Sequence, residues 1–258
     1  MSRAKIRGIF FDLDDTLIHY TEAERSALAV GCRMAAQAHH GISERALAMA
    51  IFQIYERRFC HGTEGFRELA TLSVEEFRFR LTSEALGTFG VEDPTLVRTL
   101  VDAYRVAERA ALRTIPDVRH TLSLLSPHFR LGIITNGPSA GQREKIAAVA
   151  LSEWFSEIIV DTEFGHPKPD RRIFDHAAER IGLPPEALLF VGNSLPADVA
   201  GAKGAGWTAV HLDLESRPAV PRTPCPDFTI SGLAELLLLP PIAVALTQSG
   251  TPEMVVVK

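Results

Sequence analysis

The chain has 258 residues, of which 46% are hydrophobic and 23% are charged. This is the balance of an ordinary globular protein, and it excludes a chain that is disordered along its whole length. The net charge of −5 argues against a nucleic-acid backbone or an anionic membrane as the main partner, because both attract basic surfaces.

The cysteines and the apolar runs bear on the cellular location. Cys32, Cys60 and Cys225 are sparse and far apart, which favours reduced thiols over a disulfide framework. Asp12 interrupts the short apolar run near the N-terminus, unlike the core of a signal peptide. No stretch reaches the roughly 18 apolar residues of a membrane span. We therefore expect a cytoplasmic protein.

The first predicted element is a buried strand over residues 6–11. Its apolar, β-branched and aromatic residues end abruptly in carboxylates, as in a parallel strand that delivers polar groups at its carboxyl end. From about residue 21 to 114 no strand pattern follows. This stretch instead predicts four helices, over residues 22–40, 43–59, 73–89 and 93–112.

The strand pattern resumes near residue 115. Short apolar runs at 130–135, 157–161, 188–192 and 207–212 alternate with helical patterns, which predicts βαβ units and a parallel sheet. The expected fold class is α/β, with a Rossmann-like parallel sheet core flanked by helices and an inserted all-helical cap domain. The expected bounds are 1–20 and 115–240 for the core, 21–114 for the helical domain, and 241–258 for a C-terminal tail. That tail is either an extra strand or a loosely ordered end.

Two carboxylates, Asp12 and Asp14, directly follow the first strand. On an extended segment they point the same way, because side chains alternate with a period of 2. Carboxylates held close together repel unless a cation or a proton intervenes, and Mg²⁺ prefers oxygen ligands of this kind. One aspartate could then attack while the other transfers protons. For this pair alone, a solvated Asp-rich turn is the alternative.

Three further clusters follow later predicted strands. Thr135 and Asn136 could bind a phosphate oxygen or belong to an ordinary helix cap. Lys168 stands between two prolines, where it could neutralise carboxylate and phosphate charge or simply lie on the surface. Asn193 and Asp198 could complete a metal shell, or Asn193 or Ser194 could simply cap a helix. Because ligands in open α/β sheets bind beyond the carboxyl ends of the strands, the common placement predicts one site.

Taken together and in this order, the motifs resemble those of the haloacid dehalogenase (HAD) superfamily, in subfamily I with its helical C1-type cap. The resemblance covers about residues 6–213. DLDDT matches the first motif, TNG the second and the lysine of HPKPD the third, whereas GNSLPAD matches the acidic fourth motif only in part.

The resemblance implies a phosphatase mechanism and assigns roles within it. Asp12 would attack phosphorus and form an aspartyl-phosphate. Asp14 would protonate the leaving oxygen and then activate the hydrolytic water. Thr135 and Lys168 would hold the phosphoryl group, with Asn136 also assigned to substrate binding, and Lys168 would anchor Asp12. A cap of this kind would close over the site, excluding water and contacting the leaving group.

The implied cofactor is Mg²⁺, held by Asp12, the backbone carbonyl of Asp14, and the acidic-motif side chains Asn193 and Asp198. The departure from the family pattern is Asn193, where many relatives carry aspartate. An amide oxygen can still bind Mg²⁺ but removes one negative charge, which predicts weaker metal binding. Whether Asn193 or Asp198 is the direct ligand stays open.

The function expected from the resemblance is hydrolysis of a small phosphorylated metabolite, such as a sugar phosphate or a nucleotide. The alternatives are a phosphomutase of the same family, a 2-haloacid dehalogenase, and a non-catalytic HAD-fold binding protein. Asp14 argues against the dehalogenase, whose relatives lack an aspartate there, and Asn193 motivates the binding protein. The expected partner is a small-molecule phosphate ester, with no nucleic acid and no membrane, and a homodimer is one option for assembly.

Overall fold

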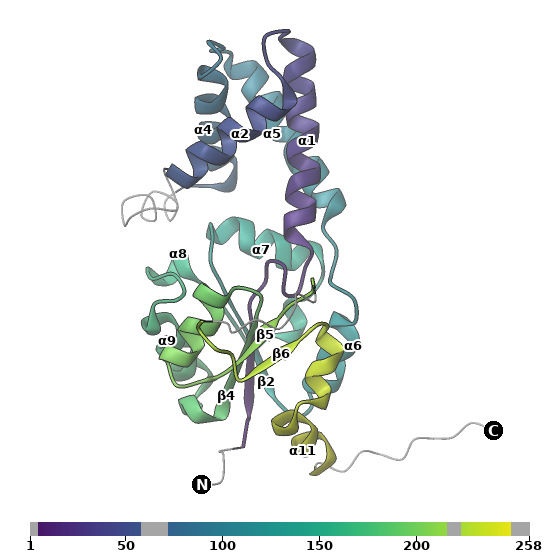
Figure 1. Cartoon of the computed structure of the whole chain (residues 1–258), viewed down its shortest axis with the longest axis vertical. Coiled ribbons are helices and arrows are strands. Elements are labelled where there is room, and N and C mark those ends of the chain that lie inside the picture. Colours follow the sequence, from purple (N-terminus) through teal and green to yellow (C-terminus); the bar gives the residue numbers. More distant parts are fainter. Residues whose placement is uncertain (1–4, 58–71, 216–222, 249–258) are drawn as a thin grey trace, which may run out of the picture. The chain divides into compact units, whose positions relative to one another are not determined.

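The computed structural model describes residues 5–57, 72–215 and 223–248. The chain forms two compact units, drawn in Figure 1. The α/β unit comprises Met1–Ile18, Thr114–Thr135 and Ala150–Lys258, and the helical unit comprises His19–Arg113 and Asn136–Val149.

A six-stranded parallel sheet, in the order β3-β2-β1-β4-β5-β6, forms the centre of the α/β unit. The predicted Rossmann-like parallel sheet is thereby confirmed, and its five predicted strands correspond to β1–β5. The short β6 did not follow from the sequence pattern. The strands are β1 Gly8–Phe11, β2 Arg130–Thr135, β3 Glu157–Val160, β4 Leu188–Gly192, β5 Thr208–Leu212 and β6 Phe228–Ile230.

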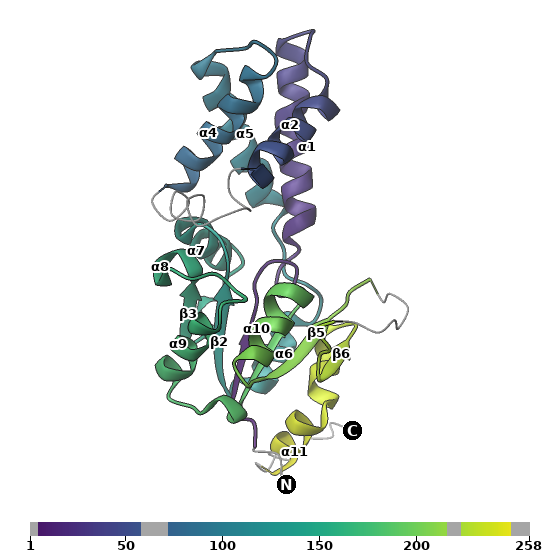
Figure 2. The same cartoon turned by 60° about the vertical axis from the view of Figure 1, so that its left-hand side comes forward.

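Helices cover both faces of this sheet, with α9 on one side and α6 on the other (Figures 1 and 2). On the α9 side, Phe174 meets Phe190 edge-on with ring centroids 5.3 Å apart, and Phe10 packs on Trp207 at 5.3 Å. These rings form one buried cluster with aliphatic residues of the strands, and this burial stabilises the sheet. The helices of the unit are α6 Val118–Leu125, α8 Asp161–Phe164, α9 Arg171–Ile181, α10 Ala200–Gly204 and α11 Pro240–Gln248.

The register of the central strands places the carboxyl ends of β1 and β4 next to each other. Phe11, the last residue of β1, pairs with Ile133 of β2 and Val191 of β4. The backbone N–H of Asp12 then donates to the carbonyl of Val191 at 2.9 Å. The segments that follow β1 and β4 therefore leave the sheet side by side.

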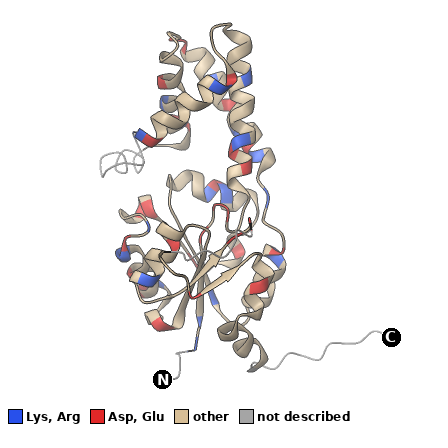
Figure 3. Cartoon of the chain, in the orientation of Figure 1, with Lys and Arg blue, Asp and Glu red and all other residues tan. Residues whose placement is uncertain are grey.

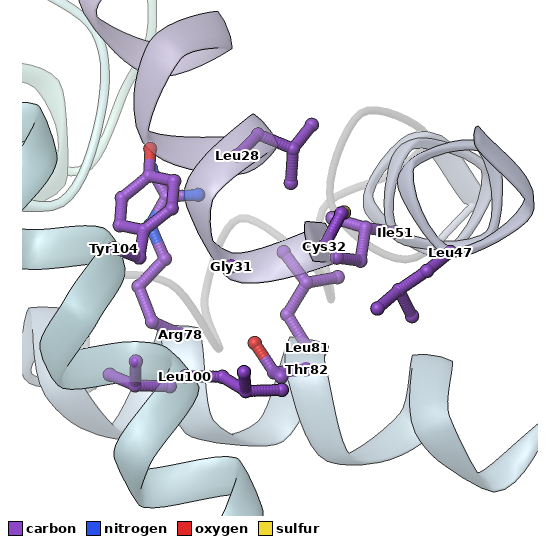
Figure 4. A pocket seen from close by; sticks show the side chains of 11 residues that line it. Leu28, Gly31, Cys32, Leu47, Ile51, Arg78, Leu81, Thr82, Leu100 and Tyr104 are labelled. Atoms are coloured by element: carbon purple, nitrogen blue, oxygen red, sulfur yellow. The ribbon is translucent and has the colours of Figure 1, made fainter. Parts of the chain in front are cut away.

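The helical unit contains α1 Tyr20–Ala38, α2 Glu44–Tyr55, α4 Val74–Gly87, α5 Pro94–Ala111 and α7 Ser139–Ala148. Helices α2, α4 and α5 fall within stretches expected to be helical, and α1 begins two residues before the expected stretch 22–40 and overlaps most of it. They enclose a buried cluster of their own and a small cavity of about 30 Å³ (Figure 4). Arg78 stacks over the ring of Tyr104 beside this cavity, with its guanidinium carbon 4.2 Å from the ring centroid.

Helix α7 groups with the helical unit, whereas the sequence expectation placed residues 136–149 in the core. Two side-chain contacts join α7 to other helices of this unit. Arg105 of α5 lies 3.6 Å from Glu144, and the Lys145 ammonium sits 3.5 Å above the centroid of the Tyr20 ring.

Residues 240–248 form helix α11 rather than the extra strand or loose end expected of the tail. Pro240 and Pro241 open the helix, a position where proline lacks only an N–H that would have no helical partner. Ile242 and Ala245 are buried, so one side of α11 packs against the unit. The rest of the expected tail, residues 249–258, lies outside the described residues.

Candidate active site

A buried lysine joins two of the predicted carboxylates. The Lys168 ammonium donates to Asp12 Oδ1 at 2.6 Å and to Asp198 Oδ1 at 2.8 Å. Asp12 follows β1, Lys168 precedes α9, and Asp198 lies in a π-helical turn after β4, so three separate segments supply the cluster. All three residues are buried. The structure therefore brings together residues that lie up to 186 positions apart in the chain.

The electrostatics of the cluster follow from two negative groups sharing one positive group. Burial raises the pKa of Asp12 to about 6, with Lys168 opposing the rise and Asp198 adding to it. Burial alone would lower the pKa of Lys168, but Asp12 and Asp198 outweigh it and raise the pKa. Lys168 therefore stays a cation at neutral pH, while Asp12 is mostly ionised.

A tight turn follows Asp12 and spans residues 13–18. Asp15 has φ +57°, a left-handed conformation that aspartate tolerates better than most residues. Its N–H donates to the carbonyl of Ile18 at 2.8 Å, and the Leu17 N–H donates to that of Leu13 at 2.9 Å. Asp14 pairs with Ile18 through an isolated parallel bridge. The turn thus fixes the backbone of Asp14 next to the end of β1.

The end of β4 is built around Gly192. A Cβ at this position would overlap the Asp198 carboxylate, so only glycine lets that carboxylate approach the strand. Asp198 Oδ2 accepts the backbone N–H of Ser194 at 2.9 Å. Its two oxygens are thus engaged by Ser194 and Lys168.

Thr16 connects the end of β1 to the end of β4. Its hydroxyl lies 3.2 Å from Asp12 Oδ2 and 3.5 Å from Asn193 Oδ1. Because both oxygens lie within reach of one hydroxyl, the Asp12 carboxylate and the Asn193 amide oxygen face a common region.

The second predicted cluster is divided between the two units. Thr135 is the last residue of β2, buried in the α/β unit. Asn136 begins the segment that belongs to the helical unit, where its backbone carbonyl accepts Gln142 Nε2 at 2.5 Å. Thr135 thus shares the strand-end edge with Asp12, whereas Asn136 belongs to the helical unit.

Two residues of this region were not singled out by the sequence. Thr16 is the last residue of the first motif, DLDDT. His211 lies near the end of β5, buried, with Nε2 3.0 Å from the backbone oxygen of Asn193. Polar residues at the ends of apolar strands marked the other site clusters in the sequence. His211 has the same placement, so the sequence contained a signal for it.

The donor set suits a hard divalent cation. Asp12 Oδ2 and Asn193 Oδ1 are carboxylate and amide oxygens, which Mg²⁺ prefers. In the described part of the chain, no group of three or more His, Cys, Asp and Glu side chains is arranged to hold a metal ion. A site with so few protein ligands fits Mg²⁺, which usually keeps several waters and binds substrate phosphate oxygens.

Comparisons with known proteins agree with this geometry. The family model for haloacid dehalogenase-like hydrolases matches residues 6–206. The glyceraldehyde 3-phosphate phosphatase of Methanopyrus kandleri is 30% identical over 242 residues, which cover 90% of this chain and 96% of that protein. Other relatives of similar identity are also phosphatases, including a phosphoserine phosphatase of Thermus thermophilus.

Two solved structures share the fold. The putative HAD-hydrolase YfnB of Bacillus subtilis, described as bound to magnesium, has a TM-score of 0.65 at 25% identity, covering 92% of this chain and 99% of its own. A 2-haloacid dehalogenase of Pseudomonas syringae has a TM-score of 0.67 at 25% identity, covering 95% and 100%. The chain therefore belongs to the haloacid dehalogenase-like hydrolases, and it is an enzyme of the phosphatase type within that family.

Proposed function

We propose that the protein is a Mg²⁺-dependent phosphatase of a small phosphorylated metabolite, with Asp12 as the nucleophile. The observation that carries this proposal is the split environment of the Asp12 carboxylate. Oδ1 is held by Lys168 at 2.6 Å, while Oδ2 faces Thr16 and the Asn193 amide oxygen. With Oδ1 held by the charged lysine and Oδ2 oriented by the longer contact from the Thr16 hydroxyl, the carboxylate is held in one orientation for attack through Oδ2.

The proposed reaction has two displacements at phosphorus. Asp12 attacks the phosphorus of the ester, the bond to the leaving oxygen breaks, and Asp14 protonates that oxygen. In the second step Asp14 removes a proton from water, which attacks the aspartyl-phosphate. The bond between phosphorus and Asp12 then breaks, which releases inorganic phosphate and restores the Asp12 carboxylate and the protonated Asp14.

Lys168 and Thr135 would hold the phosphoryl group during both displacements, with Asn136 assigned to the substrate as well. The raised pKa of Lys168 keeps its positive charge near the transferring group, where charge stabilisation contributes most to phosphoryl transfer.

The metal would be held by Asp12, the backbone carbonyl of Asp14, and Asn193 as the direct side-chain ligand of the fourth motif. When bound, Mg²⁺ would neutralise charge on the phosphoryl oxygens. Asp198 is assigned an indirect role, because Lys168 and Ser194 already engage its two oxygens.

The substrate class follows from the relatives and from the charge distribution. The relatives' names specify small phosphate monoesters, and we extend that class to this chain, with sugar phosphates and nucleotides included. In the described residues, acidic and basic side chains are interspersed over both units (Figure 3), as for a protein with small-molecule substrates. None of the described helices has the length and apolar character to cross a membrane. We also propose a cytoplasmic location, motivated by the sparse cysteines.

A phosphate-release assay across a panel of phosphate monoesters tests this function. We expect turnover of at least one ester with Mg²⁺ present, loss of turnover in EDTA, and loss of turnover in Asp12→Asn. Asp175→Asn, which removes a surface carboxylate on α9 that pairs with Arg171, is the matched control and should remain active. No release from any ester with Mg²⁺ present would contradict the proposal.

The same samples distinguish the alternative reactions. A phosphomutase would hold phosphate on Asp12 and pass it to a second substrate hydroxyl, with little inorganic phosphate released. A dehalogenase would release halide from a 2-haloacid in EDTA. Halide release without phosphate release would replace the proposed reaction with dehalogenation.

A further inference from the structure

The peptide unit between Asn193 and Ser194 is held at both of its polar ends. Its carbonyl oxygen lies 3.0 Å from His211 Nε2, and its N–H donates to Asp198 Oδ2 at 2.9 Å. Asp198 is in turn bound to Lys168, and Lys168 to Asp12. One end of this peptide is therefore tied to the buried charge cluster and the other to β5.

His211 is fixed in its position by the sheet. It lies in β5 directly opposite Gly192 of β4 and Thr229 of β6, and its side chain is only 5% exposed. Because a carbonyl oxygen can only accept, the contact with Asn193 requires a proton on Nε2. The imidazole therefore acts as a donor that holds the Asn193 carbonyl in one orientation.

We propose that His211 is a positioning residue that orients Asn193 for binding Mg²⁺, an inference that rests on the function proposed above. The backbone of Asn193 is held by His211, and its side-chain oxygen lies 3.5 Å from the Thr16 hydroxyl beside Asp12. An amide ligand attracts the cation through its dipole alone, so its orientation matters more than that of a charged carboxylate. Fixing the peptide orients this oxygen in advance, as outer hydrogen bonds do at metal sites.

Three substitutions separate this role from simple packing. In His211→Gln the amide nitrogen takes the place of Nε2, since both atoms lie four bonds from Cα. In His211→Asn the amide reaches only as far as Nδ1, so the donor to the Asn193 carbonyl is lost. His211→Phe keeps the ring volume without any donor, and replaces His211→Asn if that variant does not fold.

Calorimetric titration of each full-length protein with MgCl₂ measures the metal affinity without turnover. We expect His211→Asn or His211→Phe to bind Mg²⁺ about tenfold more weakly, and His211→Gln to stay within about threefold of the wild type. At saturating Mg²⁺, kcat should change little in all of them, because Asp12 and Asp14 are untouched.

The outcomes distinguish this inference from the proposed function. Equal Mg²⁺ affinity in wild type and His211→Phe, or equal loss in His211→Gln and His211→Phe, would overturn the positioning role while leaving the phosphatase intact. Failure of the wild type to bind Mg²⁺ would overturn both.

Discussion

At the scale of single residues, the site places two carboxylates and one ammonium in a buried cluster. Asp12 and Asp198 share Lys168, so one negative charge in the cluster is left without a partner charge. Burial raises the pKa of Asp12 to about 6, and the negative charge of Asp198 adds to the rise. A cation bound beside Asp12 would offset it, so the cluster is suited to metal binding at the expense of metal-free stability.

The first prediction concerns Asp12→Asn in metal-free protein. The folded state holds the Asp12 proton more tightly than the unfolded state, so the stability from this group is present below pH about 4 and is lost as pH rises through about 6. At pH 7.5 a shift from 3.8 to about 6 corresponds to a penalty on the order of 3 kcal/mol. The inactive Asp12→Asn should therefore melt several degrees higher than the wild type in EDTA.

The pH dependence provides the check on that prediction. Melting temperatures measured in EDTA between pH 4 and 8 should diverge as pH rises from about 4 to about 6 and then stay apart by a constant amount, with Asp12→Asn above the wild type. Lys168→Met is the contrasting variant. It leaves two buried carboxylates without a cation, and should melt well below the wild type at pH 7.5. If the wild type gained stability relative to Asp12→Asn as pH rises, the pKa of Asp12 would not be raised in the folded state.

A second prediction concerns Asn193→Asp. The substitution returns a negative charge to a position beside Asp12 without changing side-chain size, so Mg²⁺ should bind more tightly, by about tenfold or more for an added unit charge at contact distance. The Mg²⁺ concentration that gives half-maximal activity should fall accordingly. In EDTA the added charge should lower the melting temperature, because the cluster already has excess negative charge.

Asn193→Leu is the matched control, since it has similar volume and no oxygen ligand. It should need more Mg²⁺ than the wild type, and its metal-free stability should not fall as that of Asn193→Asp does. Equal Mg²⁺ requirements in wild type, Asn193→Asp and Asn193→Leu would rule out Asn193 as a ligand.

Some contacts of the site could be predicted from the sequence and others could not. Asp12 and Lys168 could be predicted to meet, because each follows or lies near a strand end and each has a recognisable motif. The pairing of Asp198 with Lys168 and Ser194 could not be read from spacing, since it depends on the π-helical turn Leu195–Val199 and on the space left by Gly192. His211 needed the sheet register that sets β5 beside β4.

At the scale of elements, two glycines illustrate opposite local constraints. Gly31 lies within α1 beside the small cavity, and a Cβ there would only touch the Leu100 carbonyl at 3.9 Å. Gly132 lies within β2, where a Cβ would overlap the buried ring of Phe10. Replacing glycine by alanine should therefore raise the free energy of unfolding at Gly31 and lower it at Gly132.

We expect Gly31→Ala to raise the free energy of unfolding by about 1 kcal/mol, because alanine favours the helix and fills space. Gly132→Ala should lower it by about 1–3 kcal/mol through overpacking. Urea unfolding followed by circular dichroism measures both. Gly87→Ala, at the end of α4 with no neighbour near its Cβ position, is the control and should not destabilise. A destabilised Gly31→Ala would contradict the open packing around α1.

The elements themselves were largely predictable because their patterns are local. Apolar runs gave β1–β5, and helical periodicity gave the four helices of the insert. Helix α11 was missed because its residues after Pro240 and Pro241 are apolar on several sides, a pattern that periodicity cannot assign. Strand β6 has three residues, which is too short for an alternation to appear.

At the scale of the whole molecule, the chain crosses between two units that have separate cores. The crossings fall at residues 18–19, 113–114, 135–136 and 149–150. The α/β core centres on Phe10, Phe174 and Trp207, and the helical core includes Leu81 and Leu100, with no residue common to the two clusters. The sequence predicted two domains from the change in pattern. It did not assign α7 to the helical unit, because the contacts of α7 with α5 and α1 form only in the folded chain.

Separate cores predict separate opening, which native-state hydrogen exchange can measure. Leu81→Ala removes a buried side chain of the helical core and should destabilise that unit by about 2–5 kcal/mol. Amides of α1, α2, α4 and α5 should then exchange at least about tenfold faster, whereas amides of β1, β2 and β4 keep their rates, because local opening needs only the contacts of its own unit. Phe174→Ala should reverse the pattern, accelerating the sheet amides alone. If either variant accelerated amide exchange in both units by the same factor, the whole chain would unfold in one cooperative step. The two cores would then share one free energy of unfolding.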